Sequence, residues 1–218
     1  MADITLYHGY PGVSSWSLRA WLALRKSGLD FEQKLIDYRS QAGSAELKRT
    51  SPNGLVPLLV HRAGDGETLV WESLAVCEYI AELAPAVGLW PDDRGLRALA
   101  RSVSAEMHAG FGAMRRGLDM SVLERRTADI DTPVQADIDR IAAIWSSCRS
   151  KPGAGEGPWL FGRFTVADAM YAPVATRFRT YGIPLDGAAA AYCDAVLDDP
   201  DMKVWEDMAR AIPTPPRA

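Results

Sequence analysis

The spacing of apolar residues changes about eighty residues into the chain. Before that point, short apolar runs alternate with segments at helical spacing, which predicts the order strand, helix, strand, helix, strand, strand, helix. The strands are expected at residues 3–8, 31–36, 56–61 and 67–71, and the helices at residues 17–28, 44–50 and 73–85. This alternation of elements is typical of a small α/β unit.

Helical spacing dominates the rest of the chain, where no convincing strand pattern is found. Helical segments are expected to begin near Pro91, Pro133, Val166, Gly187 and Pro200. The sequence therefore predicts an α/β domain over residues 1–83 and an all-helical domain over residues 92–218. The segment APAVGLWP is the expected linker between them.

One helix start in the second half carries a clear capping signal. In GRFTVADAMYAP, Thr165 is followed three residues later by Asp168. This spacing resembles a capping box with aspartate in place of the usual glutamate. Because such a box usually serves folding, we interpret Asp168 as structural rather than catalytic.

Composition and charge exclude several classes of protein. Of the 218 residues, 48% are hydrophobic and 24% are charged, with a formal net charge of -4. A nucleic-acid partner is not expected, because binding phosphates needs a concentrated basic face. No apolar run approaches the roughly twenty residues that span a bilayer, and MADITLYHGYPG lacks the pattern of a secretory signal. We therefore expect a cytoplasmic protein without a membrane partner.

The cysteines and histidines give no sign of a metal or redox site. The three cysteines, Cys77, Cys148 and Cys193, lie far apart in sequence and form no CxxC motif. The three histidines are His8, His61 and His108. Cys77 lies within the apolar run LAVCEYIAEL, which favours a small core residue over a reactive thiol. The histidines lack the spacing and neighbours of metal ligands. The sequence predicts no structural metal.

Two adjacent serines stand where a Gly-Pro turn leads into the first helix, in YPGVSSWSLRAWLALRKSG. Ser14 or Ser15 could cap the helix, as serine often does. Alternatively, one of the hydroxyl groups could be offered to a ligand at the helix N-terminus, where unpaired N–H groups favour an anion. The serine pair alone does not decide between these roles.

A proline opens the third predicted strand, in SPNGLVPLLV. Pro57 has no N–H for a sheet ladder, so the segment is expected to be an edge strand with a trans bond or a turn with a cis Val56–Pro57 bond. A cis bond would turn the main chain of Val56 outward and leave its N–H and C=O free to pair with an extended peptide.

Glu72 and Ser73 open a helix directly after a strand, in WESLAVCEYI. The helix N-terminus and the serine hydroxyl offer donors to a carboxylate, while the Glu72 carboxylate could accept from an ammonium group. This pair suits the carboxylate and amine of an amino acid. The simpler alternative is that one of the two residues merely caps the helix.

The order of the α/β elements and four sequence segments together resemble the cytosolic glutathione transferase superfamily. The segments are SSWSLRAWLAL, SPNGLVPLLV, ESLAVCEYIAEL and GRFTVADAMYAP. The resemblance covers nearly the whole chain. It implies a thioredoxin-like domain followed by a helical domain. The serine segment is most similar to the zeta and theta-like serine classes, whose zeta pattern runs Ser-Ser-Cys-Ser. Trp16 occupies the position of that cysteine, and this departure argues against isomerase activity of the maleylacetoacetate type.

The resemblance implies that a serine hydroxyl donates to the sulfur of glutathione, the co-substrate, and stabilises its thiolate. The zeta pattern favours Ser14, whereas the theta pattern would select Ser15. Tyr7 is a third candidate, because other classes use a tyrosine at the end of the first strand. Val56 and Pro57 would bind the cysteinyl part of glutathione, and Glu72 and Ser73 its γ-glutamyl end. For the glycyl carboxylate the resemblance leaves three residues open: Arg39, Gln41 and Lys48.

The second substrate, a small hydrophobic electrophile, is expected between the domains. Residues that could contact it are Tyr7, His108, Phe111 and Arg177. A Met and aromatic stripe at helical spacing is more often core, and His108 could equally be an interior histidine. The resemblance also implies a homodimer. Two alternatives to a transferase are a glutathione-dependent isomerase and a non-catalytic glutathione-binding relative.

Overall fold

The computed structural model describes residues 3–154 and 156–215. Its sheet contains four strands in the order β2-β1-β3-β4. The strands are β1 (Ile4–His8), β2 (Phe31–Leu35), β3 (Leu58–Ala63) and β4 (Gly66–Trp71). β1 is parallel to β2 and antiparallel to β3, and β4 returns antiparallel to β3 with Leu58 opposite Trp71. Sequence alternation along these strands divides the apolar residues between two faces.

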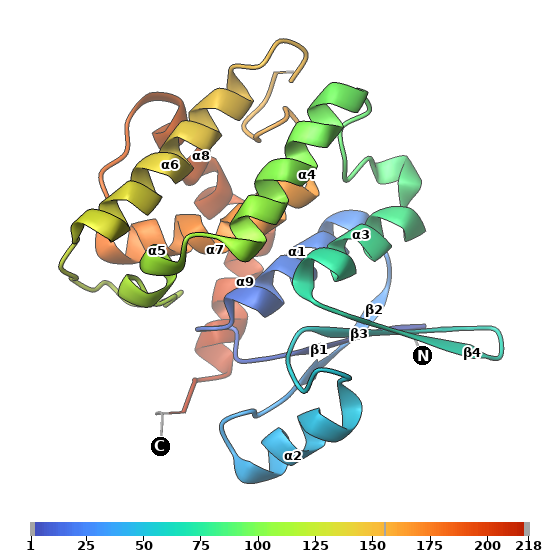
Figure 1. Cartoon of the computed structure of the whole chain (residues 1–218). Coiled ribbons are helices and arrows are strands. Elements are labelled where there is room, and N and C mark those ends of the chain that lie inside the picture. The colour runs from blue at the N-terminus through green and yellow to red at the C-terminus, as the bar shows by residue number, and fades with distance from the viewer. Residues whose placement is uncertain (1–2, 155, 216–218) are drawn as a thin grey trace.

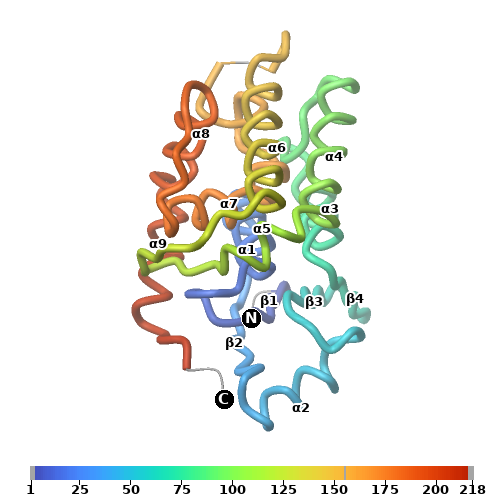
Figure 2. The backbone as a smooth tube through the Cα atoms, turned by 60° about the vertical axis from the view of Figure 1, so that its left-hand side comes forward, coloured from blue at the N-terminus to red at the C-terminus, as the bar shows by residue number. Residues whose placement is uncertain are grey.

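Helices cover both faces of the sheet. On one face, Ile4 and Leu6 of β1 join a large buried cluster that includes residues of α1 (Ser15–Ser27) and α3 (Ser73–Leu83). On the other face, Tyr7 packs with Leu47 of α2 (Gln41–Thr50) in a smaller cluster. Figure 1 and Figure 2 show α2 alone on one side of the sheet, with α1 and α3 on the side of the other helices.

The second half of the chain is helical. After a short 3₁₀ turn, Pro85–Val87, the helices are α4 (Arg94–Ala109), α5 (Gly112–Gly117), α6 (Thr132–Arg149), α7 (Val166–Tyr181), α8 (Gly187–Asp198) and α9 (Pro200–Ala211). α7 is buried along almost its whole length, because it contacts α1, α4 and α8. One continuous buried cluster therefore runs from Ile4 in the sheet to Ala209 in α9.

The predicted fold class is confirmed: a mixed four-stranded sheet with its helices precedes an all-helical part. The boundaries of several elements differ from the sequence prediction. α2 begins at Gln41 rather than Ser44, because the Ser40 hydroxyl accepts a hydrogen bond from the Gly43 N–H and caps the helix. The helix predicted from Pro91 ends at Ala109, and Phe111 with φ 60° separates it from α5. Pro57 precedes β3 instead of opening it.

The predicted capping box is confirmed at the start of α7. The buried Asp168 carboxylate accepts hydrogen bonds from the Thr165 N–H at 2.7 Å, the Thr165 hydroxyl at 2.8 Å and the Leu160 N–H at 3.0 Å. The box thus joins the helix start to the loop before it, and Asp168 has no free face for chemistry.

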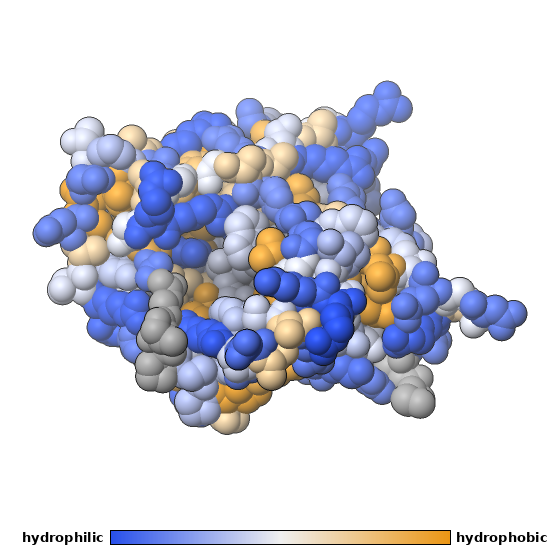
Figure 3. Space-filling model, turned by 60° about the horizontal axis from the view of Figure 1, so that its bottom comes forward, coloured by the Kyte–Doolittle hydropathy of each residue, from blue (hydrophilic) through white to orange (hydrophobic). Residues whose placement is uncertain are grey.

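The surface on the α2 side of the molecule is mainly hydrophilic, with separate apolar patches (Figure 3). Exposed apolar side chains include Leu69 and Trp71 of the edge strand β4. Among the described helices, none combines the length and apolar character needed to cross a membrane.

Candidate functional site

The turn between β1 and α1 gathers three serines. Ser14 is the N-cap residue of α1, but its side chain makes no capping hydrogen bond. Its hydroxyl instead donates to Ser17 Oγ at 2.8 Å, and Ser17 Oγ accepts from the Gly9 N–H at 3.0 Å. Ser15, the first residue of α1, is also largely buried, and its hydroxyl has no hydrogen-bond partner within residues 3–154 and 156–215. Simple capping therefore does not account for either serine.

A cavity of about 270 Å³ lies beside this helix start. It is lined by Trp16, Asn53, Leu55, Val56, Pro57, Glu72 and Ser73. The four residues that the sequence predicted for glutathione are thus brought together in one place. The Val56–Pro57 bond is cis, as one of the two sequence interpretations expected. In the part of the chain that the structure describes, the Val56 N–H and C=O make no hydrogen bond.

Glu72 and Ser73 present contrasting groups to this cavity. Glu72 is the N-cap residue of α3 and has φ 68°, a conformation that side-chain-bearing residues rarely adopt. Its carboxylate accepts a hydrogen bond from Asn53 Nδ2 at 3.1 Å and is 52% exposed. Ser73 is 1% exposed, and its buried hydroxyl has no partner among the described residues. An exposed carboxylate beside a buried free hydroxyl suits a ligand that carries both an amine and a carboxylate.

His108 of α4 lies beside Glu72, one of the residues that line this cavity. Its Nε2 lies 3.6 Å from Glu72 Oε2, so α4 faces the start of α3 at this point. Burial lowers the pKa of His108 below its ordinary value, and the nearby Arg19 guanidinium lowers it as well, while Glu72 opposes them. The imidazole is therefore mainly neutral near pH 7. His108, one of the four residues predicted for the second substrate, thus lies beside a residue predicted for glutathione.

The other three residues predicted for the second substrate lie apart from each other. Tyr7 is in the smaller core under α2, and its hydroxyl accepts from Lys34 Nζ at 3.5 Å. Phe111 is buried in the large core between α4 and α5. Arg177 of α7 is 5% exposed and borders a second cavity. The structure does not bring these side chains together, so their shared role stays a prediction.

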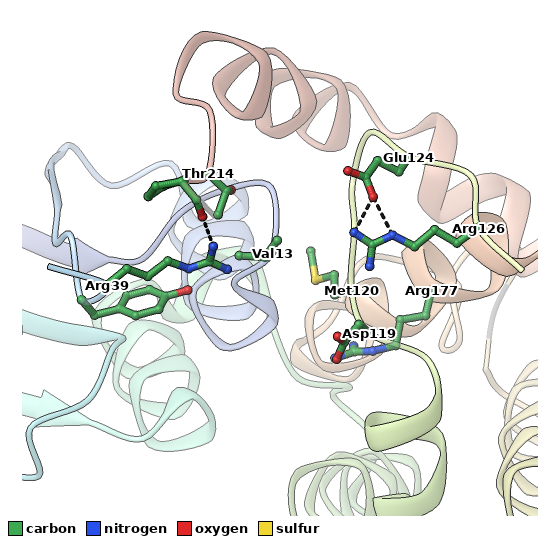
Figure 4. Close-up of a pocket in the computed structure, with 10 residues that line it drawn as sticks. Val13, Arg39, Asp119, Met120, Glu124, Arg126, Arg177 and Thr214 are labelled. Atoms are coloured by element: carbon green, nitrogen blue, oxygen red, sulfur yellow. Dashed lines mark hydrogen bonds and ion pairs between the residues drawn. The ribbon is translucent and has the colours of Figure 1, made fainter. Parts of the chain in front are cut away.

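The second cavity measures about 560 Å³ and is the larger of the two (Figure 4). Its lining residues come from both halves of the chain: Val13, Tyr38, Arg39, Asp119, Met120, Glu124, Arg126, Arg177, Thr214 and Pro215. Arg177 Nε donates to the Leu118 carbonyl at 2.8 Å, and burial lowers its pKa to about 10. Arg39 donates to the Pro215 carbonyl, which joins the β2–α2 loop to the C-terminal segment.

Sequence reasoning missed two residues near these cavities. Asn53, in the turn SPNG, donates a hydrogen bond to the Glu72 carboxylate, and its position three residues before the predicted peptide-pairing residue Val56 was a usable signal. Tyr38 lies over Gly9, with its Cε1 2.5 Å from where a Cβ of Gly9 would be, and the Ser14 Oγ is 3.2 Å from the same point. Nothing in the sequence pattern places Tyr38 beside Ser14. Within the described ranges, no three His, Cys, Asp or Glu side chains gather to hold a metal ion.

Comparisons with curated proteins give relatives of the isomerase and transferase kinds. A probable maleylacetoacetate isomerase of Caenorhabditis elegans is 33% identical over 123 residues, covering 56% of this chain and 55% of that protein. Glutathione S-transferase Z2 of Arabidopsis thaliana is 26% identical over 167 residues, covering 73% of this chain and 70% of that protein. The alignment with the first of these relatives thus spans about half of its length.

Solved structures share the fold over nearly the whole chain. A glutathione transferase homolog from Burkholderia GL BGR1, with bound glutathione, has 25% identity and a TM-score of 0.69, covering 95% of this chain and 98% of that one. A maleylacetoacetate isomerase from Anaeromyxobacter dehalogenans 2CP-1 with bound glutathione has 23% identity and a TM-score of 0.70, covering 98% of each chain. The latter likeness concerns the fold alone.

Family models match both halves of the chain. The model described as glutathione S-transferase, N-terminal domain, matches residues 13–83, and the model of the C-terminal domain of the same family matches residues 98–200. The two matches occur in the order that the fold requires, with the cavity at Val56, Glu72 and Ser73 in the first. The chain belongs to the glutathione S-transferase family.

Proposed function

We propose that this protein is a glutathione transferase, which activates the thiol of glutathione for attack on small electrophiles. The observation that carries the proposal is the single cavity in which Val56, Pro57, Glu72 and Ser73 meet beside the start of α1. Relatives named glutathione S-transferase and a structural neighbour with bound glutathione support it.

Glutathione would lie extended across this cavity. The free main chain of Val56 would pair with the cysteinyl residue, in the manner of a peptide added to a sheet edge. The Glu72 carboxylate would accept from the γ-glutamyl ammonium, and the Ser73 hydroxyl, which has no partner among the described residues, would donate to the γ-glutamyl carboxylate. His108, 3.6 Å from Glu72, would close this end from the helical half.

A serine of the β1–α1 turn would then stabilise the thiolate. A free cysteine thiol has a pKa of about 8.5, and lowering it by about two units corresponds to about 2.7 kcal/mol. A hydrogen bond to a charged group supplies about 1.5–3 kcal/mol and a helix N-terminus about 0.3–1 kcal/mol more. These contributions suffice without a general base. We place Ser14 first, with Ser15 as the alternative, since Tyr7 lies in the core under α2.

Alanine substitution of the two serines tests the mechanism. We expect Ser14→Ala to lower the rate of conjugation by about a hundredfold, because the lost charged hydrogen bond stabilises the thiolate. The affinity for glutathione, measured by calorimetry, should change by a few-fold at most. Ser102→Ala on the exposed face of α4 is the matched control. Unchanged rates in both Ser14→Ala and Ser15→Ala would remove serine activation, and no heat of glutathione binding to the wild type would remove the function itself.

A glutathione-dependent isomerase is the second candidate, since several relatives bear the name maleylacetoacetate isomerase. In that reaction the thiolate would add reversibly to a cis double bond. Turnover of a cis-enedione acid in preference to an aryl halide would favour this candidate, whereas glutathione binding without turnover of either compound would indicate a non-catalytic relative.

The cellular setting belongs to the same proposal. We propose a cytoplasmic homodimer, by likeness to the family, with no metal in its mechanism. Leu69 and Trp71 of β4, 37% and 41% exposed, are apolar side chains available for a contact between subunits.

A further inference from the structure

The side chain of Trp16 lies where the candidate glutathione cavity meets the helical half. Trp16 is the second residue of α1, and its side chain lines the cavity with Val56 and Pro57. The ring of His108 from α4 lies edge-on to the indole, with the ring centroids 5.3 Å apart. The indole therefore contacts both the lining of the cavity and α4.

Two guanidinium groups fix this indole in place. The Cζ atom of Arg19 lies 4.4 Å from the ring centroid of Trp16, and that of Arg115 from α5 lies 4.8 Å from it. Arg19 is fully buried, and only its Nε has a partner among the described residues, the Met170 carbonyl at 3.0 Å. A buried cation without a carboxylate gains stabilisation from an aromatic face. Rotating Trp16 away would remove that face from both cations at once.

A second cavity borders Val13, the residue before the serine pair Ser14 and Ser15. Val13, three residues before Trp16, lines the larger cavity together with Met120 and Arg177. Figure 4 shows Val13 between the Arg39 side of this cavity and the side formed by Asp119, Met120 and Arg177. Ser14 and Ser15 thus lie in the sequence between Val13, which borders the larger cavity, and Trp16, which lines the smaller one.

We propose that Trp16 is a specificity-determining residue: it closes the α4–α5 side of the thiol site, so that the second substrate reaches the sulfur from the Val13 side. This inference rests on the proposed function. Removing the indole would open space next to α4 and α5 and admit larger electrophiles. Filling the space at Val13 would obstruct the remaining approach.

Isothiocyanates of increasing size test this arrangement with one reaction. The glutathione thiolate sulfur bonds to the central carbon, the electron pair moves to nitrogen, and nitrogen takes a proton to give a dithiocarbamate. We expect Trp16→Ala to raise the ratio of kcat/KM for phenethyl isothiocyanate to that for ethyl isothiocyanate by about tenfold, as enlarging a pocket commonly does. Trp16→Phe should raise this ratio less, because the ring is smaller but keeps its face for the guanidinium groups.

Val13→Trp is the complementary variant. It should lower kcat/KM for both isothiocyanates by about tenfold, while the Kd of glutathione from calorimetry stays within about twofold. Val204→Trp on the exposed side of α9 controls for an added indole. If Trp16→Ala does not fold, the intermediate ratio expected for Trp16→Phe decides the matter.

An unchanged size ratio in the folded Trp16 variants, or full activity in Val13→Trp, would overturn the inference. Absence of glutathione binding by the wild type would overturn the proposed function instead, and the calorimetric titration separates the two failures.

Discussion

Single buried polar residues decide much of the chemistry and the stability of this protein. Ser73 and Asp168 are both almost fully buried at helix starts, but their hydrogen bonding differs. Asp168 has three donors around its carboxylate, whereas the Ser73 hydroxyl has no partner among the described residues. A buried polar group without a partner is costly unless a ligand supplies one. We therefore interpret Asp168 as a residue that stabilises the fold and Ser73 as a residue that binds a ligand.

Asp168 should also give a pH-dependent contribution to stability. Burial raises its pKa to about 6, above the ordinary value of an aspartate, despite the three hydrogen bonds. Its contribution is therefore fully present below the unfolded-state pKa and falls as the pH rises through about 6. We expect Asp168→Ala to lower the free energy of unfolding by about 3 kcal/mol or more at about pH 5, because three buried donors lose their acceptor. The loss should be smaller at about pH 7.5.

Urea unfolding at the two pH values measures this difference. Asp93→Ala removes an exposed N-cap of α4 and provides the cost of an ordinary cap, about 1 kcal/mol. A loss for Asp168→Ala that grows toward pH 7.5 would contradict the expectation and indicate that the hydrogen bonds outweigh burial.

At the scale of elements, the site is built from two helix starts that follow strands. α1 begins with a serine turn after β1, and α3 begins at Glu72 directly after β4. The sheet order places β1 next to β3, and β3 next to β4, so both helices start along the same region of the sheet. Their N-termini and the segment at Val56 therefore converge on one cavity.

Glu72 joins binding to backbone strain at the start of α3. We expect Glu72→Gly to raise the free energy of unfolding by about 1 kcal/mol, because glycine adopts φ 68° without steric cost. The same change should weaken glutathione binding by about tenfold or more, since the carboxylate for the γ-glutamyl ammonium is lost. Thermal unfolding and calorimetry measure the two effects.

Phe111→Gly is the matched comparison, because Phe111 also has positive φ but is buried in the core. There the lost packing should outweigh the relief of strain and destabilise the protein by about 3–5 kcal/mol. Unchanged glutathione affinity in Glu72→Gly would show that Glu72 has no part in binding.

At the scale of the whole molecule, the two halves share one core. The buried cluster includes Leu6 of β1, Trp21 of α1, Met107 of α4 and Ala175 of α7. Arg39 and Pro215 add a contact between the α/β half and the C-terminal segment. The division into residues 1–83 and 92–218 stays a prediction about independent domains. The shared core therefore couples the packing of the two halves.

The proposed homodimer can be tested at the edge of the sheet. Leu69 and Trp71 are two positions apart on β4 and therefore point to the same face of the sheet. We expect Trp71→Glu to shift the protein from dimer to monomer, because a charge in an apolar interface is costly to desolvate. Light scattering after size exclusion gives the mass of each variant. Glu67→Gln on the same strand is the control, and a wild-type monomer would refute the proposal.

Patterns among residues close in sequence predicted a large part of the fold. The apolar alternation of β1 and β4, the capping signal at Thr165 and the shift to helical spacing each depend on residues close in sequence. The start of α2 and the break at Phe111 were not predicted, because they depend on a side-chain cap and on an unusual backbone angle. Neither leaves a strong periodic signal.

The sequence by itself determined the order of the elements, the family and the segments that meet at the first cavity, because these depend on spacing along the chain. Only the tertiary structure decided that His108 faces Glu72, that Tyr7 points to α2, and that Trp16 lies between Arg19 and Arg115. Such contacts join residues far apart in sequence, and the packing of α4, α5 and α7 against α1 selects them. Periodicity fixes which face of a helix is buried, but not which side chain it meets there.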